Sequence, residues 1–228
     1  MFSGSVQTPI VSLFSSAGSE PLHSFACFLD DSKSTPAPPT PAELISSHPI
    51  GADNNSQRMG YALTQTVLHL QSPSLTRAYI RCPPHDWGRS CIGREGDLGL
   101  KHPWVHIQVR NMGRPWSFEL GLVDQTGREG IVRCSTFQNE PLLKPTSPPL
   151  LHLPLSFPSA STTPLTSWST ISLYLPTLLL HEIELPSARF SHVSYVKVYA
   201  TCRLKRVWFS EADSSQKLPW EFELYAES

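Results

Sequence analysis

Short stretches in which apolar and polar residues alternate are the feature that most limits how this chain can fold. In "WVHIQVR" (104–110) and "WSFELGLV" (116–123), every second residue is apolar. Because successive side chains of a strand point to opposite faces of its sheet, this period predicts strands with one buried face. Similar stretches occur at 64–70, 77–82, 131–137, 151–155, 168–175, 193–209 and 220–225. The sequence therefore predicts about nine strands.

Prolines and turn residues separate these stretches. The chain has 22 prolines among 228 residues, about twice the usual share, so long helices are not expected. "DQTG" (124–127) lies between two predicted strands and indicates a hairpin. The one helix candidate is a short segment from Pro176 to Glu184, with proline at its start. We expect an all-β fold, an antiparallel β-sandwich resembling a jelly roll, with at most one or two short helices.

Two regions rich in proline and serine interrupt the pattern. Residues 31–60 have no sustained periodicity and are predicted to form a disordered insertion. Residues 144–167 are predicted to form a proline-rich loop region in which 151–155 is an edge strand, because proline cannot donate to a sheet ladder. A length of 228 residues fits one domain. We therefore expect a single β-sandwich domain over residues 1–228.

Charge and cysteine content restrict the partners and the compartment. The formal net charge is −1, which argues against nucleic acid or an anionic membrane as a partner of the whole surface. No apolar stretch approaches the roughly 20 residues of a membrane span. The five cysteines are odd in number and irregularly spaced, as is usual in a reduced, intracellular chain. The cytoplasm is the expected compartment.

Neither a metal site nor a catalytic site is predicted. Cys82, His85, Cys91 and His102 are zinc-ligand types, but the cysteine spacing does not match a compact zinc knuckle. We expect Cys82 and Cys202 to be buried thiols. The sequence has no nucleophile elbow and no phosphate-binding loop. We predict no enzyme activity, no cofactor and no small-molecule substrate, while a zinc-dependent enzyme or zinc-stabilised module stays a third interpretation.

Four tryptophans allow a second interpretation. Trp104, Trp116, Trp208 and Trp220 all lie in predicted strands or next to them. Aromatic residues in strands usually pack in the core or against a cross-strand partner. A carbohydrate-binding-type module would instead require these tryptophans to be exposed together on one concave face.

The predicted strand at 193–209 contains a break in its alternation. Up to Leu204, one face is apolar, but Arg206 then falls at a position that should point inward. Val207 and Phe209 are apolar at positions that should point outward. One extra residue would restore the pattern, so the sequence predicts a β-bulge that aims Arg206 toward solvent.

Charge is unevenly distributed around this break. Residues 189–206 contain five cations and no acid, whereas residues 210–228 contain five acids and one lysine. The cations can form a solvated strand face that resists edge pairing. They can also form a docking patch for an acidic protein surface. The candidate binding residues are Arg203, Lys205, Arg206 and Lys197.

Several blocks of the sequence resemble, in order, the family of cilia- and flagella-associated protein 20. The blocks are "SAGSEPL" (16–22), "YIRCP" (79–83), "LGLKHPWVHIQVRN" (98–111), "WSFELGLVD" (116–124), "ATCRLKRVWFSE" (200–211) and "LPWEFELY" (218–225). The resemblance covers most of the chain outside 31–60 and 144–167. The segment around Cys202 is its most specific part.

The resemblance implies an antiparallel β-sandwich without enzymatic activity. It also implies a microtubule-associated structural protein of the ciliary axoneme, basal body or centriole, which supports cilium assembly and motility. Members of the family bind the microtubule lattice and bridge tubulin protofilaments, so the implied partners are tubulin and other axonemal inner-junction proteins. Arg203, Lys205 and Arg206 match the family's basic run position by position. Because tubulin surfaces are acidic, the resemblance gives this run a partner.

Overall fold

The structure is a computed structural model that describes residues 1–2, 4–28, 67–72, 77–84, 96–157, 168–178, 189–213, 219 and 222. Its regular elements, in chain order, are β1 (Ile10–Ser15), β2 (Ala26–Phe28), β3 (Leu68–Leu70), β4 (Tyr79–Cys82), β5 (Trp104–Asn111), β6 (Ser117–Asp124), β7 (Glu129–Ser135), β8 (Leu142–Lys144), β9 (Leu150–Pro154), β10 (Trp168–Tyr174), α1 (Leu175–Thr177), β11 (Phe190–Tyr199) and β12 (Cys202–Ser210).

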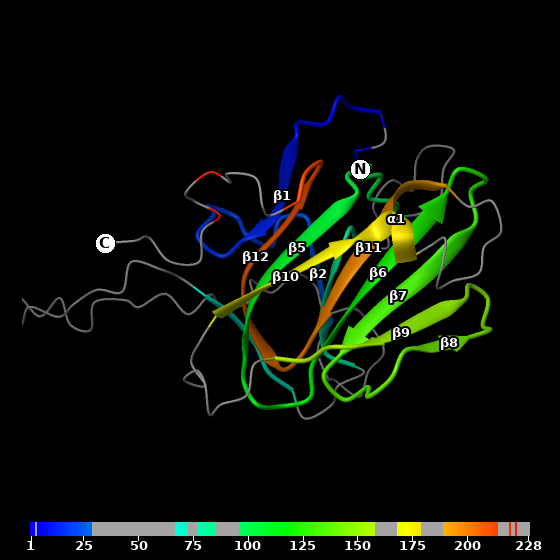
Figure 1. The fold of residues 1–228 in the computed structure, drawn as a ribbon. Helices are drawn as coiled ribbons and strands as arrows, with labels where there is room; N and C mark the ends of the chain where they lie inside the picture. Colours follow the sequence, from blue (N-terminus) through cyan, green and yellow to red (C-terminus); the bar gives the residue numbers. More distant parts are fainter. Residues whose placement is uncertain are drawn as a thin grey trace, which may run out of the picture.

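The strands form two stacked sheets (Figure 1). Sheet A has five strands: β1, β12, β5 and β10 follow one another in that order, and β3 also pairs with β12. Sheet B has seven strands in the order β2-β4-β11-β6-β7-β9-β8. Nearly all pairs are antiparallel, and the short helix α1 follows β10 directly. The predicted all-β sandwich is confirmed.

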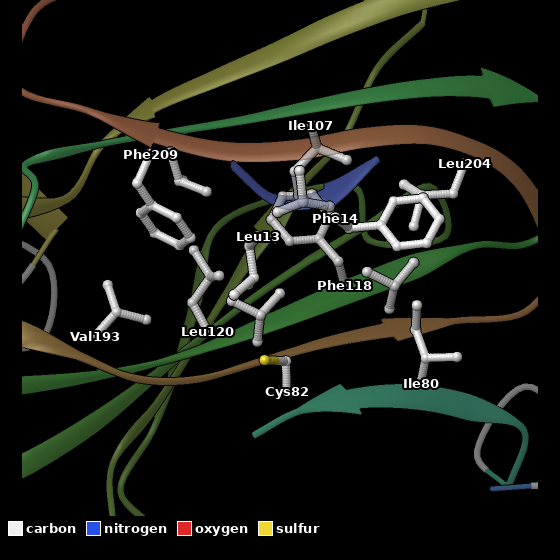
Figure 2. Packing of buried hydrophobic residues seen from close by; sticks show 14 of the residues in the cluster. Leu13, Phe14, Ile80, Cys82, Ile107, Phe118, Leu120, Val193, Leu204 and Phe209 are labelled. Carbon is white, nitrogen blue, oxygen red and sulfur yellow. The ribbon is translucent and has the colours of Figure 1, made fainter. Parts of the chain in front are cut away.

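The core fills the space between the two sheets. Figure 2 shows Ile107, Leu204 and Phe209 from sheet A facing Phe118 and Leu120 from sheet B. These side chains are almost completely removed from water. Because burial of a large apolar side chain contributes about 1.5–3 kcal/mol, this layer supplies most of the stabilisation of the sandwich.

The predicted strand at 193–209 is in fact two strands in two sheets. β11 lies in sheet B between β4 and β6, and β12 lies in sheet A between β1 and β5. The chain crosses from one sheet to the other at residues 200–201, yet the apolar face stays inward throughout. The buried residues of this face are Val196, Val198, Ala200, Cys202 and Leu204. A continuous period of two therefore concealed the crossing, since both sheets cover the same core.

The proline-rich region holds an interior strand, which corrects the prediction of an edge strand. β9 pairs with β7 on one side, in parallel, and with β8 on the other. Its prolines do not disturb these ladders because Pro149 precedes the strand and Pro154 ends it. The pair β7–β9 is also an exception to the antiparallel arrangement that we expected.

Other predictions differ in detail. The "DQTG" hairpin is confirmed as the β6–β7 turn, where Gly127 has φ +82. β1, β2 and β8 were not predicted. In β1 the reason is a register shift between Ser12 and Phe14, which breaks the alternation. The helix is limited to α1 in the described part. Residues 31–60, 179–188 and most of 220–225 lie outside the described residues.

Candidate partner-binding surface

A β-bulge at Lys205 sets the geometry of the basic segment. Leu204 pairs with Val109 of β5, and Arg206 pairs with the next β5 residue, Gln108. β12 therefore advances by two residues while β5 advances by one, which is the definition of a bulge. The predicted break in alternation is confirmed. After it, Val207 and Phe209 are fully buried, because the extra residue returns them to the inner face.

Arg203 and Arg110 lie directly opposite each other on the outer face of sheet A. They are cross-strand partners, and their neighbours Leu204 and Val109 are fully buried on the inner face. His69 of β3 pairs with Arg203 on its other side. The row His69–Arg203–Arg110 thus crosses three adjacent strands. Together with Lys205 and Arg206, these residues are called the basic surface below.

The basic surface has a positive electrostatic character. Burial and then the charge of Arg203 lower the pKa of His69. Burial and then the charge of Arg206 lower the pKa of Lys205. Among the described residues, no carboxylate forms an ion pair with Arg110 or Arg203, since the acids in ion pairs are Glu20, Asp97, Glu119 and Asp124. An anion from another molecule would therefore meet a favourable potential here.

Phe222 lies over the neighbouring part of the same face. The Arg206 guanidinium is 5.1 Å from the centre of the Phe222 ring, and the Trp208 ring is 5.3 Å from it. Gln108 Nε2 donates a hydrogen bond of 2.5 Å to the carbonyl oxygen of Phe222. His106, Gln108 and Trp208 are fully buried although they point away from the core. Phe222 thus contacts sheet A next to its cations.

Lys197 does not join the other predicted binding residues. It belongs to β11 and lies on the outer face of sheet B, where its Nζ is 3.1 Å from Glu119 Oε1. The structure therefore brings Arg203, Lys205 and Arg206 together on sheet A and places Lys197 on the other sheet. Proximity in sequence was misleading because the chain changes sheets between these residues.

The partner of Lys197 is the centre of a buried polar cluster. Glu119 accepts hydrogen bonds from Tyr195 Oη at 2.7 Å, from Tyr199 Oη at 3.4 Å and from Arg133 Nε at 3.0 Å. Glu119, Arg133, Tyr195, Lys197 and Tyr199 are called the Glu119 cluster below. Burial alone would raise the pKa of Glu119, but Lys197, Tyr195 and Arg133 together hold this pKa below its usual value. Burial, and next the negative charge of Glu119, raise the pKa of both tyrosines.

A glycine lets Tyr195 reach Glu119. Gly121 is the cross-strand partner of Tyr195 on the outer face of sheet B. A Cβ on Gly121 would lie 2.5 Å from Tyr195 Cε1, which is too close for real atoms. The Tyr195 ring therefore lies across β6 in space that only glycine leaves open.

The tryptophans that the structure describes do not form the platform that a carbohydrate module needs. Trp116 lies in the core between the sheets and is 1% exposed. Trp208 is on the outer face of sheet A but is 0% exposed, because Phe222 and His106 pack against it. Trp220 lies outside the described residues. Trp104 shares the outer face of sheet A with Trp208 and is half-buried. The described tryptophans therefore lack the joint exposure on one face that the second interpretation requires.

The described residues give no support to the zinc interpretation. Cys82 and Cys202 are fully buried free thiols, as predicted, and Cys82 points into the core (Figure 2). Burial raises the pKa of the Cys82 thiol to about 12, so the metal-binding thiolate is disfavoured. His102 Nε2 bonds to the Thr8 carbonyl oxygen at 2.7 Å. His85 and Cys91 lie outside the described residues, which hold no group of three potential metal ligands.

Two residues of interest were missed by the sequence analysis. Arg110 alternates with Val109, which indicated an outward position, but only the β5–β12 register shows that it faces Arg203. Glu119 sits in an alternating strand in the same way, and its four partners come from two other strands. Such pairings cannot be read from a single stretch.

No helix of the described residues is long and apolar enough to span a membrane.

Comparison with known proteins gives the family. The CFA20 domain matches residues 54–226. "Cilia- and flagella-associated protein 20" of Caenorhabditis briggsae is 24% identical over 160 residues, which are 70% of this chain and 68% of that protein. The Chlamydomonas reinhardtii protein of the same name is 24% identical over 164 residues, 72% of this chain and 75% of its own length. The Paramecium tetraurelia protein of this name is 21% identical over 164 residues, which are 72% of this chain and 75% of that protein. This chain belongs to the CFA20 domain family.

Proposed function

We propose that the protein is a non-catalytic, microtubule-associated structural protein of the cilium, located in the axoneme or at the basal body. Its relatives are named cilia- and flagella-associated proteins. The observation that carries the proposal is the bulge at Lys205, because it places Arg203 and Arg206 on the same outer face. Acidic tubulin surfaces are the partner that this basic surface fits.

The size of the expected contribution is moderate. Arg203, Lys205 and Arg206 are half-buried, so each contact with an acidic partner is worth a few tenths to about 1 kcal/mol. Three contacts then contribute roughly 1–3 kcal/mol, which corresponds to about a ten- to hundredfold change in affinity. The remaining affinity must come from shape and apolar contacts elsewhere on the sandwich.

Bridging of protofilaments requires a second contact. We assign it to the outer face of sheet B, which lies on the other side of the sandwich from the basic surface. There the side chains of Lys197 and Arg133 keep 20% and 33% of their exposure while Glu119 fixes their position. Other axonemal inner-junction proteins are candidate partners for this face.

Co-sedimentation with microtubules tests the proposal. The triple variant Arg203→Glu/Lys205→Glu/Arg206→Glu should remain folded but lose most of its pelleting, because three attractive contacts become repulsive. The matched control is Lys101→Glu/Lys144→Glu/Arg189→Glu, which reverses three exposed cations outside the basic surface. It should pellet like the wild type.

Salt provides a second test. The Debye length falls from about 10 Å at 0.1 M to about 3 Å at 1 M salt, so pelleting of the wild type should decrease over this range. The proposed role of the basic surface would be contradicted if the folded wild-type protein did not pellet. It would also be contradicted if neither salt nor the triple substitution changed the amount that pellets.

A further inference from the structure

Arg110 and Arg203 form a like-charged cross-strand pair. Each is the direct partner of the other in the β5–β12 ladder, and both point to the outer face of sheet A. Like charges directly opposite each other destabilise a sheet. In the described part of the chain, neither arginine has a carboxylate in an ion pair. The pair is therefore unfavourable in the free protein and becomes favourable when an anion lies between the two guanidinium groups.

Arg110 shows a second sign of an incomplete site. Its Nε is buried, and no hydrogen-bond acceptor for it is found among the described residues. A buried donor without a partner costs free energy, so the Arg110 side chain is held in an unfavourable environment in the free protein. Because a guanidinium can bind a carboxylate through two parallel hydrogen bonds, Arg110 is suited to accept this group from outside.

The bulge at Lys205 determines the spacing of the cations. Arg203 is level with Arg110, and Arg206 is level with Gln108, which is two residues away along β5. Two residues of a strand span about 6.6–6.8 Å, and this is also the distance between alternate side chains of an extended peptide. If Lys205 instead paired with Gln108 in a regular ladder, Arg206 would lie opposite the inward-pointing Ile107. The cations therefore repeat at the same interval as every second side chain of an extended segment.

We propose that the Arg110–Arg203 pair, with Arg206 in the next row, binds an extended acidic segment of a protein partner that carries carboxylates at alternate positions. One carboxylate lies between Arg110 and Arg203, and the next lies at Arg206. This inference deepens the proposed function, on which it rests, by naming the chemistry of the bound segment and by adding Arg110 to the surface.

Fluorescence anisotropy with two labelled peptides tests the spacing. One peptide alternates glutamate and serine, and the other has the same composition with all glutamates in one block. At low salt, near 50 mM, the full-length protein should bind the alternating peptide more tightly by about fivefold, the effect of one well-placed ionic contact. Equal affinity for the two peptides, or for single-stranded DNA of equal charge, would overturn the proposal, because either result indicates attraction to net charge alone.

The variant Arg110→Gln tests the site itself. It should weaken binding of the alternating peptide about fivefold, whereas Arg189→Gln, an exposed arginine next to sheet B, should have no effect. Arg110→Gln should also raise the thermal midpoint by about 1–3 °C, since it removes the repulsion from Arg203. Unchanged binding, or a lower midpoint, would show that Arg110 is a structural residue and would overturn the inference.

Microtubule pelleting separates this inference from the proposed function. If Arg110→Gln and wild type pellet equally and the peptides do not bind, the inference fails while the microtubule role stands. If the wild type binds the alternating peptide but does not pellet, the acidic-segment site stands and its partner is a different protein. A wild-type protein that neither binds the alternating peptide nor pellets with microtubules contradicts both the inference and the proposed function.

Discussion

At the scale of single residues, Gly121 is the position where the smallest change should have the largest effect. Gly121→Ala should lower the free energy of unfolding by about 1–3 kcal/mol, because the new methyl group overlaps the Tyr195 ring and Ser194 Oγ. Urea denaturation measures this loss. Gly4→Ala is the matched control, since a Cβ at Gly4 has no heavy atom within 4 Å. Equal midpoints for the two variants would show that Tyr195 does not lie across β6.

Glu119 is the second sensitive residue. Glu119→Gln leaves Lys197 and Arg133 without their carboxylate and should lower stability by about 2–4 kcal/mol at neutral pH. This expected loss is smaller than that for a completely buried ion pair, because the side chains of Lys197 and Arg133 keep 20% and 33% of their exposure. Thermal or urea unfolding near pH 7 checks it. Glu140→Gln, an exposed glutamate, should change little.

The same substitution predicts a change in pH dependence. The pKa of Glu119 is lower in the folded protein than in the unfolded chain, so the unfolded chain binds the proton more readily. Its stabilisation is complete above the unfolded value, about 4.3, and is lost as pH falls through the lower folded value. Between neutral pH and acid, the wild type should therefore lose more stability than Glu119→Gln. Parallel curves down to acid unfolding would contradict the charged state assigned to Glu119.

At the scale of the elements, the bulge in β12 allows a deletion to be predicted. Removal of Lys205 leaves Leu204 inward, Arg206 outward and Val207 inward, which is a regular ladder. The carbonyl of Lys205 accepts a hydrogen bond from the Ser16 amide, so the deletion should cost only about 1 kcal/mol. Removal of Leu204 instead places Lys205 at an inward position and should unfold the sheet. Thermal unfolding followed by circular dichroism measures the stability of the two deletion variants. An equal loss of stability in both would contradict the bulge.

The element scale also shows what the sequence could predict and why. Period-two stretches predicted β4, β5, β6, β7, β10 and the inward residues of β11 and β12, because one side of each of these strands faces a single core. β1 was missed because its own register shift breaks the period. β9 was placed at an edge because prolines near a strand suggested an unpaired side, whereas they lie at its ends.

The sequence predicted only part of the candidate site, because a local pattern does not contain the pairing of distant strands. Local pattern revealed the bulge and the outward direction of Arg203 and Arg206. Pairing between strands distant in sequence decided the rest: Arg110 is 93 residues before Arg203, and Glu119 is 78 residues before Lys197. The register of such pairs depends on the whole fold, so single stretches do not contain it.

At the scale of the whole molecule, the two outer faces differ in chemistry. On sheet B, the carboxylate of Glu119 offsets the charges of Lys197 and Arg133. On sheet A, Arg110 and Arg203 face each other, and Phe222 packs beside them on Arg206 and Trp208. A partner that approaches sheet A therefore meets cations and Phe222 together. This arrangement links the affinity of the basic surface to the position of Phe222.

The position of β12 in sheet A also has a consequence for biosynthesis. β1 pairs with β12, whose residues follow it by more than 190 positions, and β5 also depends on β12 as a neighbour. At translation rates of about 5–20 residues per second, β1 leaves the ribosome roughly 10–40 s before its partner. During that interval the nascent chain exposes unpaired strand edges and the apolar faces of β1 and β5. The time for which the nascent chain needs chaperones is therefore set by the synthesis of β12, the last of the described strands.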